Sequence, residues 1–221
     1  MSMNLVIFGA GDIAQLAHFY LTRDSAYRPV AFTVDGAYVK ESTFEGLPVV
    51  PFEEIASKFS PAENSMFVAL SYSQVNQLRA AKYAEAKAKG YRLISYVSSR
   101  ATYYGTEIGD NCFIFEDNTI QPFTKIGSNV TMWSGNHVGH HSTIGDHCFV
   151  SSHVVISGGV IVEPYCFLGV NSTIRDHVTI GARTVIGMGA MVTKNCDPDS
   201  VYVGSPAQRK SSSAPDELKK I

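Results

Sequence analysis

Residues 138–162 read VGHHSTIGDHCFVSSHVVISGGVIV, with an aliphatic side chain at every sixth position. The interval extends in both directions from Ile108 to Val192, which is 84 residues or fourteen steps of six. Neither an α-helix, with 3.6 residues per turn, nor an ordinary strand, with period two, keeps that register. Short strands on the three faces of a triangular coil do keep it. The stretch therefore predicts a hexapeptide β-helix in which eighteen residues make one turn.

The position four residues after each aliphatic side chain should also point into the prism, and only small or medium residues stand there. They are Cys112, Asn118, Thr124, Val130, Asn136, Ser142, Cys148, Val154, Val160, Cys166, Ser172, Val178, Thr184, Ala190 and Cys196. All four cysteines of the chain belong to this set, and none forms a C-x-x-C pair. We therefore expect reduced, structural thiols rather than a metal or redox motif.

Glycine often follows the aliphatic residue directly, at Gly109, Gly127, Gly139, Gly145, Gly169, Gly181 and Gly187. These positions fall at the corners of the coil, where we expect the backbone to need a positive φ.

The first half follows a different pattern, because apolar strand-like runs alternate with helical stretches. We expect strands at residues 4–8, 29–35, 46–50, 66–70 and 93–97, and helices after Gly11, over 51–59 and over 73–89. This alternation predicts a small parallel α/β domain. The predicted organisation is a Rossmann-like domain over 1–98, a β-helix over 99–204, and a C-terminal cap and tail over 205–221, of which residues 211–221 are expected to be polar and mobile.

Composition excludes several classes of function. The formal net charge is −2 and no lysine- or arginine-rich block occurs, so we expect a small-molecule partner and no nucleic acid. No apolar run reaches the roughly 20 residues of a membrane span, and the first residues lack the features of a secretory signal. The expected location is the cytoplasm.

A glycine-rich turn follows the first predicted strand, with the pattern Gly9-x-Gly11-x-x-Ala14. Small residues at these positions let backbone N–H groups approach a diphosphate at a helix N-terminus. The same pattern also occurs in purely structural turns. Asp35, at the end of the second strand, could accept hydrogen bonds from a ribose or base. Because this half is too short for two mononucleotide-binding halves, one nucleoside diphosphate fits better than NAD.

Histidine is the second chemical signal, because five of the seven histidines lie between His137 and His153. The six-residue register places His140 and His141 near a corner, where an imidazole can accept a proton from an attacking amine or hydroxyl. Adding eighteen to 140 gives Gly158, one coil away at about 4.8 Å. The backbone N–H groups of Gly158 and Gly159 could stabilise an oxyanion there.

A metal site is the alternative reading, since His141 and His177 are two coils apart in one column. Zinc sites need three converging ligands. Position 159 between the two histidines is glycine and no third histidine converges, so we expect no metal.

Four motifs together resemble the bacterial sugar O/N-acyltransferases of the NeuD/PglD-like family. They are GAGDIA at 9–14, VGHHSTIGDHCFVSSHVVISGG at 138–159, CFLGVNSTI at 166–174 and VYVGSPAQRK at 201–210. The resemblance covers nearly the whole chain. It implies a left-handed β-helix, a homotrimer, and transfer from acetyl-CoA or another acyl-CoA to a nucleotide-linked amino sugar.

The resemblance also implies roles for particular residues. His140 corresponds to the general base of the family. An acidic residue normally follows it, but this chain has His141, which leaves Asp146 or a water as candidates for the assisting role. Acyl-CoA is expected to contact Phe149, Gly158, Val170, Gly187 and Met188. The nucleotide sugar is expected at Gly11, Asp12, Ile13, Asp35, Ser71 and Tyr72.

The sequence-based hypothesis is therefore direct N-acyl transfer in the biosynthesis of a bacterial surface glycan such as lipopolysaccharide O-antigen. Two alternatives remain open. One is O-acylation of a sugar, as on a sialic acid. The other is a trimer that binds a sugar nucleotide without catalysis.

Overall fold

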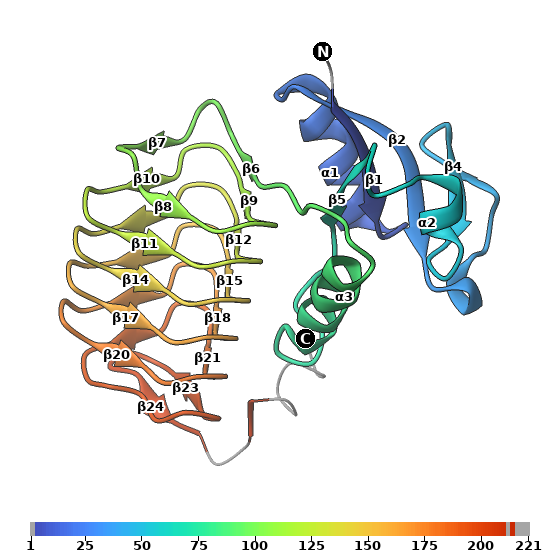
Figure 1. The fold of residues 1–221 in the computed structure, drawn as a ribbon. Helices are drawn as coiled ribbons and strands as arrows, with labels where there is room; N and C mark the ends of the chain where they lie inside the picture. The colour runs from blue at the N-terminus through green and yellow to red at the C-terminus, as the bar shows by residue number, and fades with distance from the viewer. Residues whose placement is uncertain (1–2, 211–212, 215–221) are drawn as a thin grey trace. The chain divides into compact units, whose positions relative to one another are not determined.

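The computed structural model describes residues 3–210 and 213–214, and the chain forms two compact units (Figure 1). The first unit contains the residues up to Ser71 together with Ala81–Tyr96. The second contains Tyr72–Ala80 and the chain from Val97 onward. The division differs from the predicted boundary at residue 98 mainly in one short segment, Tyr72–Ala80, which belongs with the β-helix.

The first unit is an α/β sheet with strand order β3-β4-β2-β1-β5. Its strands are β1 (Met3–Phe8), β2 (Tyr27–Val34), β3 (Thr43–Phe44), β4 (Leu47–Pro51) and β5 (Ser65–Val68). Strands β4, β2, β1 and β5 run parallel, as predicted from the alternation of strands and helices. The helices are α1 (Asp12–Arg23), the 3-10 turn η1 (Gly36–Tyr38), α2 (Ile55–Lys58) and α3 (Gln77–Ala88).

Two local predictions in this unit were wrong, and one strand was not predicted. Strand β3 forms an antiparallel hairpin with β4, a pairing that the sequence did not reveal. The helix expected over residues 51–59 is reduced to α2, because Pro51 ends β4 instead of opening a helix. The strand expected over 93–97 is reduced to an isolated bridge at Leu93, and β6 (Tyr96–Val97) pairs with a sheet of the β-helix.

The second unit is a β-helix whose three sheets stack strands of two or three residues from successive coils, and all pairs except the terminal β23–β24 pair run parallel (Figure 1). One sheet, called face 1, contains β6, β9 (Phe113–Ile114), β12 (Thr131–Met132), β15 (Phe149–Val150), β18 (Phe167–Leu168), β21 (Val185–Ile186), β23 (Val201–Val203) and β24 (Gln208–Arg209). Face 2 contains β7 (Thr102–Tyr103), β10 (Thr119–Ile120), β13 (His137–Val138), β16 (Val155–Ile156), β19 (Thr173–Ile174) and β22 (Met191–Val192). Face 3 contains β8 (Glu107–Ile108), β11 (Lys125–Ile126), β14 (Thr143–Ile144), β17 (Ile161–Val162) and β20 (Thr179–Ile180).

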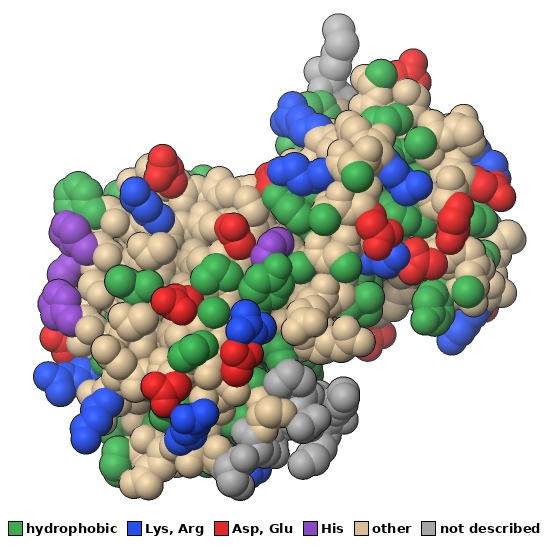
Figure 2. Space-filling view, turned by 60° about the horizontal axis from the view of Figure 1, so that its bottom comes forward, with side chains coloured by type: hydrophobic (Ala, Val, Ile, Leu, Met, Phe, Trp, Pro, Cys, Tyr) green, Lys and Arg blue, Asp and Glu red, His purple; other side chains and the backbone are tan. Residues whose placement is uncertain are grey.

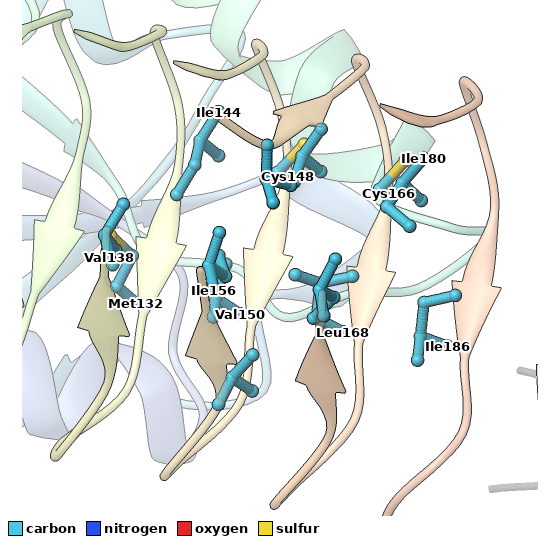
Figure 3. Close-up of a cluster of buried hydrophobic side chains, with 14 of the residues drawn as sticks. Met132, Val138, Ile144, Cys148, Val150, Ile156, Cys166, Leu168, Ile180 and Ile186 are labelled. Atoms are coloured by element: carbon cyan, nitrogen blue, oxygen red, sulfur yellow. The ribbon is translucent and has the colours of Figure 1, made fainter. Parts of the chain in front are cut away.

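Strand pairing confirms the predicted turn of eighteen residues. In face 2, for example, Val138 pairs with both Ile120 and Ile156. The aliphatic side chains of the repeat point inward and form one core along the coil axis (Figure 3). Every residue predicted at the second inward position is also at most 5% exposed, including all four cysteines. Burial raises the pKa of the Cys196 thiol to about 12, which suits an inert side chain.

The polar residues at the second inward position connect successive coils through hydrogen bonds. Ser142 Oγ donates to Ser157 O at 2.9 Å and accepts from Val160 N–H at 3.1 Å. Asn118 Nδ2 likewise donates to Trp133 O at 2.9 Å. A buried polar group costs little when it is hydrogen-bonded, so these residues tie neighbouring coils together within an apolar core.

The reason given for the corner glycines was wrong. The positive φ falls two residues later, at Asn111, Asn129, His141, His147 and their counterparts. The glycines are needed because the next coil packs directly against them. A Cβ on Gly139 would lie 2.5 Å from Gly158 N, and one on Gly169 would lie 2.6 Å from Met188 N.

The C-terminal end of the coil is closed by residues 201–210. Strand β23 pairs with β21 and turns back into β24, and Ala207 N–H donates to Met191 O at 2.7 Å. Tyr202 and Ala207 pack against the core. Of the tail predicted to be mobile, only Ser213 and Ala214 are described, and Ala214 is buried against face 1. The rest of that prediction lies outside the described residues.

The segment Tyr72–Ala80 covers the outer side of face 1. Gln74, Val75 and Asn76 have φ of 54°, 51° and 67°, so a left-handed turn replaces the first part of the helix predicted from residue 73. This conformation costs about 1–2 kcal/mol for each L-residue. The cost is offset by packing and hydrogen bonding, because Val75 is fully buried and Asn76 Nδ2 donates to Tyr165 O and Cys166 O, each at 3.2 Å.

A buried arginine and a polar ladder follow the corner between faces 3 and 1. Arg79 Nη2 donates to the carbonyls of Asn129, His147 and Cys148 at 3.0–3.2 Å, and burial lowers the pKa of Arg79 to about 10. Asn129 Nδ2 donates to His147 Nδ1 at 2.9 Å, which requires that nitrogen to be unprotonated. Burial lowers the pKa of His147, and the charge of Arg79 acts in the same direction.

We predict that His147 makes the fold sensitive to acid. The unfolded chain binds a proton on this histidine near its usual pKa of about 6.5, whereas the folded chain does so only at lower pH. The free energy of unfolding should therefore decrease as the pH falls from about 7 through 6.5 toward the folded-state value. Urea unfolding at pH 7.5 and 5.5 measures this loss, which should be smaller in His147→Gln than in wild type.

The exposed His153 provides a matched control. His153→Gln should keep the wild-type loss of stability, and an equal loss in His147→Gln and His153→Gln would contradict the assignment.

Candidate functional site

Two imidazoles meet at the corner between faces 2 and 3. His140 and His141 are both exposed, and their Nδ1 atoms lie 3.1 Å apart with the rings at 85°. One Nδ1 must therefore donate and the other accept. When His140 is the donor, its Nε2 is free to take a proton. Histidine side chains gather along the outer left edge of the β-helix in Figure 2. We refer to His140 and His141 as the histidine pair.

Gly158 lies next to His140, as the eighteen-residue register predicted. A Cβ on Gly158 would lie 2.8 Å from Cε1 and 2.9 Å from Nε2 of His140, so the imidazole occupies the space that a side chain at 158 would fill. Gly159 N–H donates to His140 O at 2.8 Å and is therefore not available to a ligand. For Gly158 N–H no acceptor is found among the described residues. Of the two backbone N–H groups predicted to stabilise an oxyanion, only that of Gly158 is therefore available.

The preceding coil supports the histidine pair from the other side. His140 N–H donates to Gln121 Oε1 at 2.9 Å, and His141 N–H donates to Pro122 O at 3.3 Å. The Phe123 ring lies 4.8 Å from the His141 ring. Sequence reasoning missed Gln121 and Phe123, although subtracting eighteen from 141 leads directly to Phe123.

The histidines that cluster in the sequence do not cluster in space. His137 lies on face 2, His147 at the corner between faces 3 and 1, and His153 at the corner between faces 1 and 2. His177, which seemed separate, reaches the corner of the histidine pair, because its ring occupies the space beside Gly159. In the ranges 3–210 and 213–214, no group of three or more His, Cys, Asp or Glu side chains could hold a metal ion.

The residues expected to contact acyl-CoA fall into two groups. Val170 and Met188 are 43% and 76% exposed on successive coils at the corner between faces 1 and 2, with Gly187 beside Met188. Face 2 separates them from Gly158 and presents the exposed side chains Val155 and Met191. Exposed apolar side chains are thus present at this corner and on face 2, where Thr173 stands between Val155 and Met191.

Phe149 is not part of that surface. It lies on face 1, is 3% exposed, and packs against Tyr72 and Phe167, with ring centroids 5.0 and 5.6 Å away. Because the chain's own segment covers the ring, we remove Phe149 from the expected acyl-CoA contacts.

The glycine-rich turn has the geometry of a phosphate-binding turn. Gly9 has φ of 128°, and a Cβ there would lie 2.7 Å from Ala69 O. Gly11 is the N-cap of α1 and has open space around it, and the first hydrogen bond of the helix runs from Gln15 N–H to Gly11 O. Among the described residues, no acceptor is found for the N–H groups of Asp12 and Ile13. Their partial positive charge favours an anion.

The other expected nucleotide contacts are only partly available. Asp35 Oδ1 accepts from Lys82 Nζ at 2.8 Å, so this carboxylate is half of an ion pair. Burial acts to lower the pKa of Lys82, but hydrogen bonds to Asp35 and Glu85 raise this pKa overall, so Lys82 remains protonated. The sequence analysis did not identify this cation. Ser71 belongs to the first unit, whereas the Tyr72 ring packs on Phe167 of face 1 at 4.9 Å. We therefore remove Tyr72 from the nucleotide contacts.

Asp146 does not assist His140 within this chain. It lies at the corner between faces 3 and 1, where its Oδ1 accepts from Ser128 N–H at 2.7 Å. The partner of His140 Nδ1 is His141 itself. The corner between faces 2 and 3 can therefore accept a proton at His140 and stabilise a negative oxygen at Gly158 N–H.

We predict that Gly158→Ala displaces the His140 ring, because the added Cβ would lie 2.8–3.2 Å from three of its atoms. NMR spectra of histidine ring protons should show changed His140 and His141 resonances in this variant. Ser157→Ala, on the same turn, adds no atom and should leave those resonances in place. Unchanged spectra in Gly158→Ala would contradict the described geometry.

Comparisons with known proteins agree with this architecture. A family model described as bacterial transferase hexapeptide (six repeats) matches residues 124–158 and 159–194. PerB from Caulobacter crescentus, solved with CoA and GDP-perosamine, is 25% identical with a TM-score of 0.84, over 94% of this chain and 97% of that one. The acetyltransferase domain of PglB from Neisseria gonorrhoeae, solved with acetyl coenzyme A, is 19% identical with a TM-score of 0.83, over 95% and 100%. WeeI from Acinetobacter baumannii is 20% identical with a TM-score of 0.64, over 94% and 100%.

Among the residues that the structure describes, no helix has the length and apolar character needed to cross a membrane.

Proposed function

We propose that this chain, a hexapeptide-repeat sugar acyltransferase of the NeuD/PglD type, transfers an acyl group from acyl-CoA to the amine of a nucleotide-linked sugar. The observation that carries the proposal is the placement of the His140 imidazole over Gly158. That arrangement puts a proton acceptor beside an unused backbone donor, and acyl transfer requires both groups.

The reaction proceeds in one transfer without an acyl-enzyme intermediate. The amine nitrogen attacks the thioester carbonyl, and a C–N bond forms while the carbonyl electrons move onto oxygen. Gly158 N–H donates to that oxyanion. His140 Nε2 takes a proton from the nitrogen, the C–S bond breaks, and the departing thiolate takes the proton from His140. A donor aimed at such an oxyanion contributes about 3 kcal/mol.

His141 performs the task that an acidic residue performs in the family. His140 Nδ1–H donates to His141 Nδ1 across 3.1 Å, which fixes the His140 tautomer with Nε2 unprotonated. After His140 takes the proton, the lone pair of His141 stabilises the imidazolium.

The remaining parts of the proposal concern the substrates and the assembly. The exposed Val170, Met188 and Met191 suit the apolar portion of acyl-CoA, and Gly11, Asp12 and Ile13 suit the diphosphate of the acceptor. An amine acceptor is supported by PerB, which was crystallised with GDP-perosamine. A homotrimer would cover the apolar side chains that are exposed on face 2 in a single chain. The proposed pathway is bacterial surface-glycan biosynthesis in the cytoplasm.

The direct test is an assay of CoA thiol release with acetyl-CoA and a panel of GDP-, dTDP- and UDP-linked amino sugars. We predict transfer to at least one amino sugar, and a loss of about 10³-fold in turnover in His140→Ala, because a positioned base contributes roughly 10²–10⁴-fold. Thiol release is followed with a chromogenic disulfide.

The matching hydroxyl sugars separate N-acylation from O-acylation, and His153→Ala serves as the control for removal of an exposed histidine. Turnover near wild type in His140→Ala, with the trimer intact by sedimentation, would contradict the assignment of the base.

A second prediction concerns His141. His141→Ala removes the acceptor for His140 Nδ1–H and should lower kcat by roughly 10²-fold, since misplacing a reacting group costs about that much. His141→Glu, which restores the pattern of the family, should retain more activity than His141→Ala and shift the acidic limb of the pH–rate profile. Equal activities and profiles in the two variants would show that His141 has no part in proton transfer.

A further inference from the structure

We infer that Phe123 forms the wall of the acceptor-sugar subsite and thereby determines which sugars reach His140. The inference rests on the proposed function, and it gives the coil that contains Phe123 a role in selecting the acceptor sugar. Phe123 precedes His141 by one turn of the β-helix in the same column, and their ring centroids are 4.8 Å apart at an angle of 35°. The Phe123 ring and the histidine pair therefore form one continuous surface.

The placement of Phe123 is unfavourable for the fold by itself. Its φ is 64°, a region that bulky residues rarely occupy, although histidines, Tyr165 and Arg183 stand at the equivalent position of other turns in this chain. The side chain is also 74% exposed, so the core gains almost nothing from it. Exposed aromatic surface beside reactive groups is typical of a binding surface.

The order of the coils indicates which substrate the ring contacts. Gly158, the proposed oxyanion donor, lies on the coil after the histidine pair, and the exposed Val170 and Met188 lie on later coils still. The acyl donor therefore approaches from that side. Phe123 lies on the coil before the histidine pair, which leaves the acceptor as the substrate on its side.

The chemistry of the acceptor fits an aromatic wall. A pyranose ring presents C–H groups on one face, and a deoxy sugar adds a methyl group, so both can pack on an aromatic ring. Such a contact depends on apolar packing and requires no charge or hydrogen bond from the protein. His141 forms the polar edge of the same subsite.

The test compares Phe123→Ala and Phe123→Tyr with wild type in steady-state acyl transfer. Loss of the ring should raise KM for the amino sugar about five- to tenfold, which corresponds to an aromatic contact, and leave KM for acyl-CoA within about twofold. Phe123→Tyr keeps the ring and should remain close to wild type. Tyr165→Ala removes an aromatic residue that also has a positive φ, 65°, but lies at the corner between faces 3 and 1, and it should change neither constant.

A raised KM for acyl-CoA, or identical constants in Phe123→Ala and Tyr165→Ala, would overturn the inference while leaving the proposed function in place. Absence of transfer in wild type would instead count against the proposed function. Calorimetric titration of each variant with the nucleotide amino sugar supplies a readout that does not depend on turnover. Equal affinity in Phe123→Ala and wild type would also overturn the inference.

Discussion

Parallel backbone pairing at an interval of eighteen residues, which is constant from β8 to β22, is the constraint on which the other features of the β-helix depend. The strands from β6 to β22 contain two residues each, so no single strand is stable alone, and the ladder of neighbouring coils holds all of them in register. The same register fixes the site. His140, His141 and Gly158 are brought together by backbone geometry, and the histidine pair needs no packed side-chain core around it.

Glycine residues at the corners of the β-helix do more than allow close packing of the coils. At the corner between faces 2 and 3, the imidazole of a neighbouring coil occupies the space beside a glycine, as His140 does at Gly158 and His177 at Gly159. A glycine in a β-helix corner can therefore place the functional group of another coil and expose its own backbone N–H. Substitution of Gly158 would therefore affect both the proposed base and the proposed oxyanion donor, which lie on adjacent coils.

Much of the fold could be predicted from the sequence, because inward positions every six residues must be apolar or small and nothing else in a chain repeats with that period. The sequence also contained an unused signal: the outward residues of face 1 include Phe149 and Phe167, which shows that this face is covered. The left-handed turn at Val75 could not be predicted, because it is stabilised by tertiary packing against local preference. The tautomers of the histidine pair and the Lys82–Asp35 ion pair likewise depend on side-chain geometry that periodicity does not specify.

The central claim is that His140 and Gly158 carry out direct transfer from thioester to amine. The most direct measurement is a single-turnover experiment in which enzyme in excess over acetyl-CoA is mixed with and without an amino-sugar nucleotide, and free thiol and N-acetyl product are quantified together. The account predicts one thiol for each N-acetyl product and, without acceptor, thiol release no faster than solution hydrolysis. A burst of thiol in the absence of acceptor, with an acetyl group left on the protein, would contradict it.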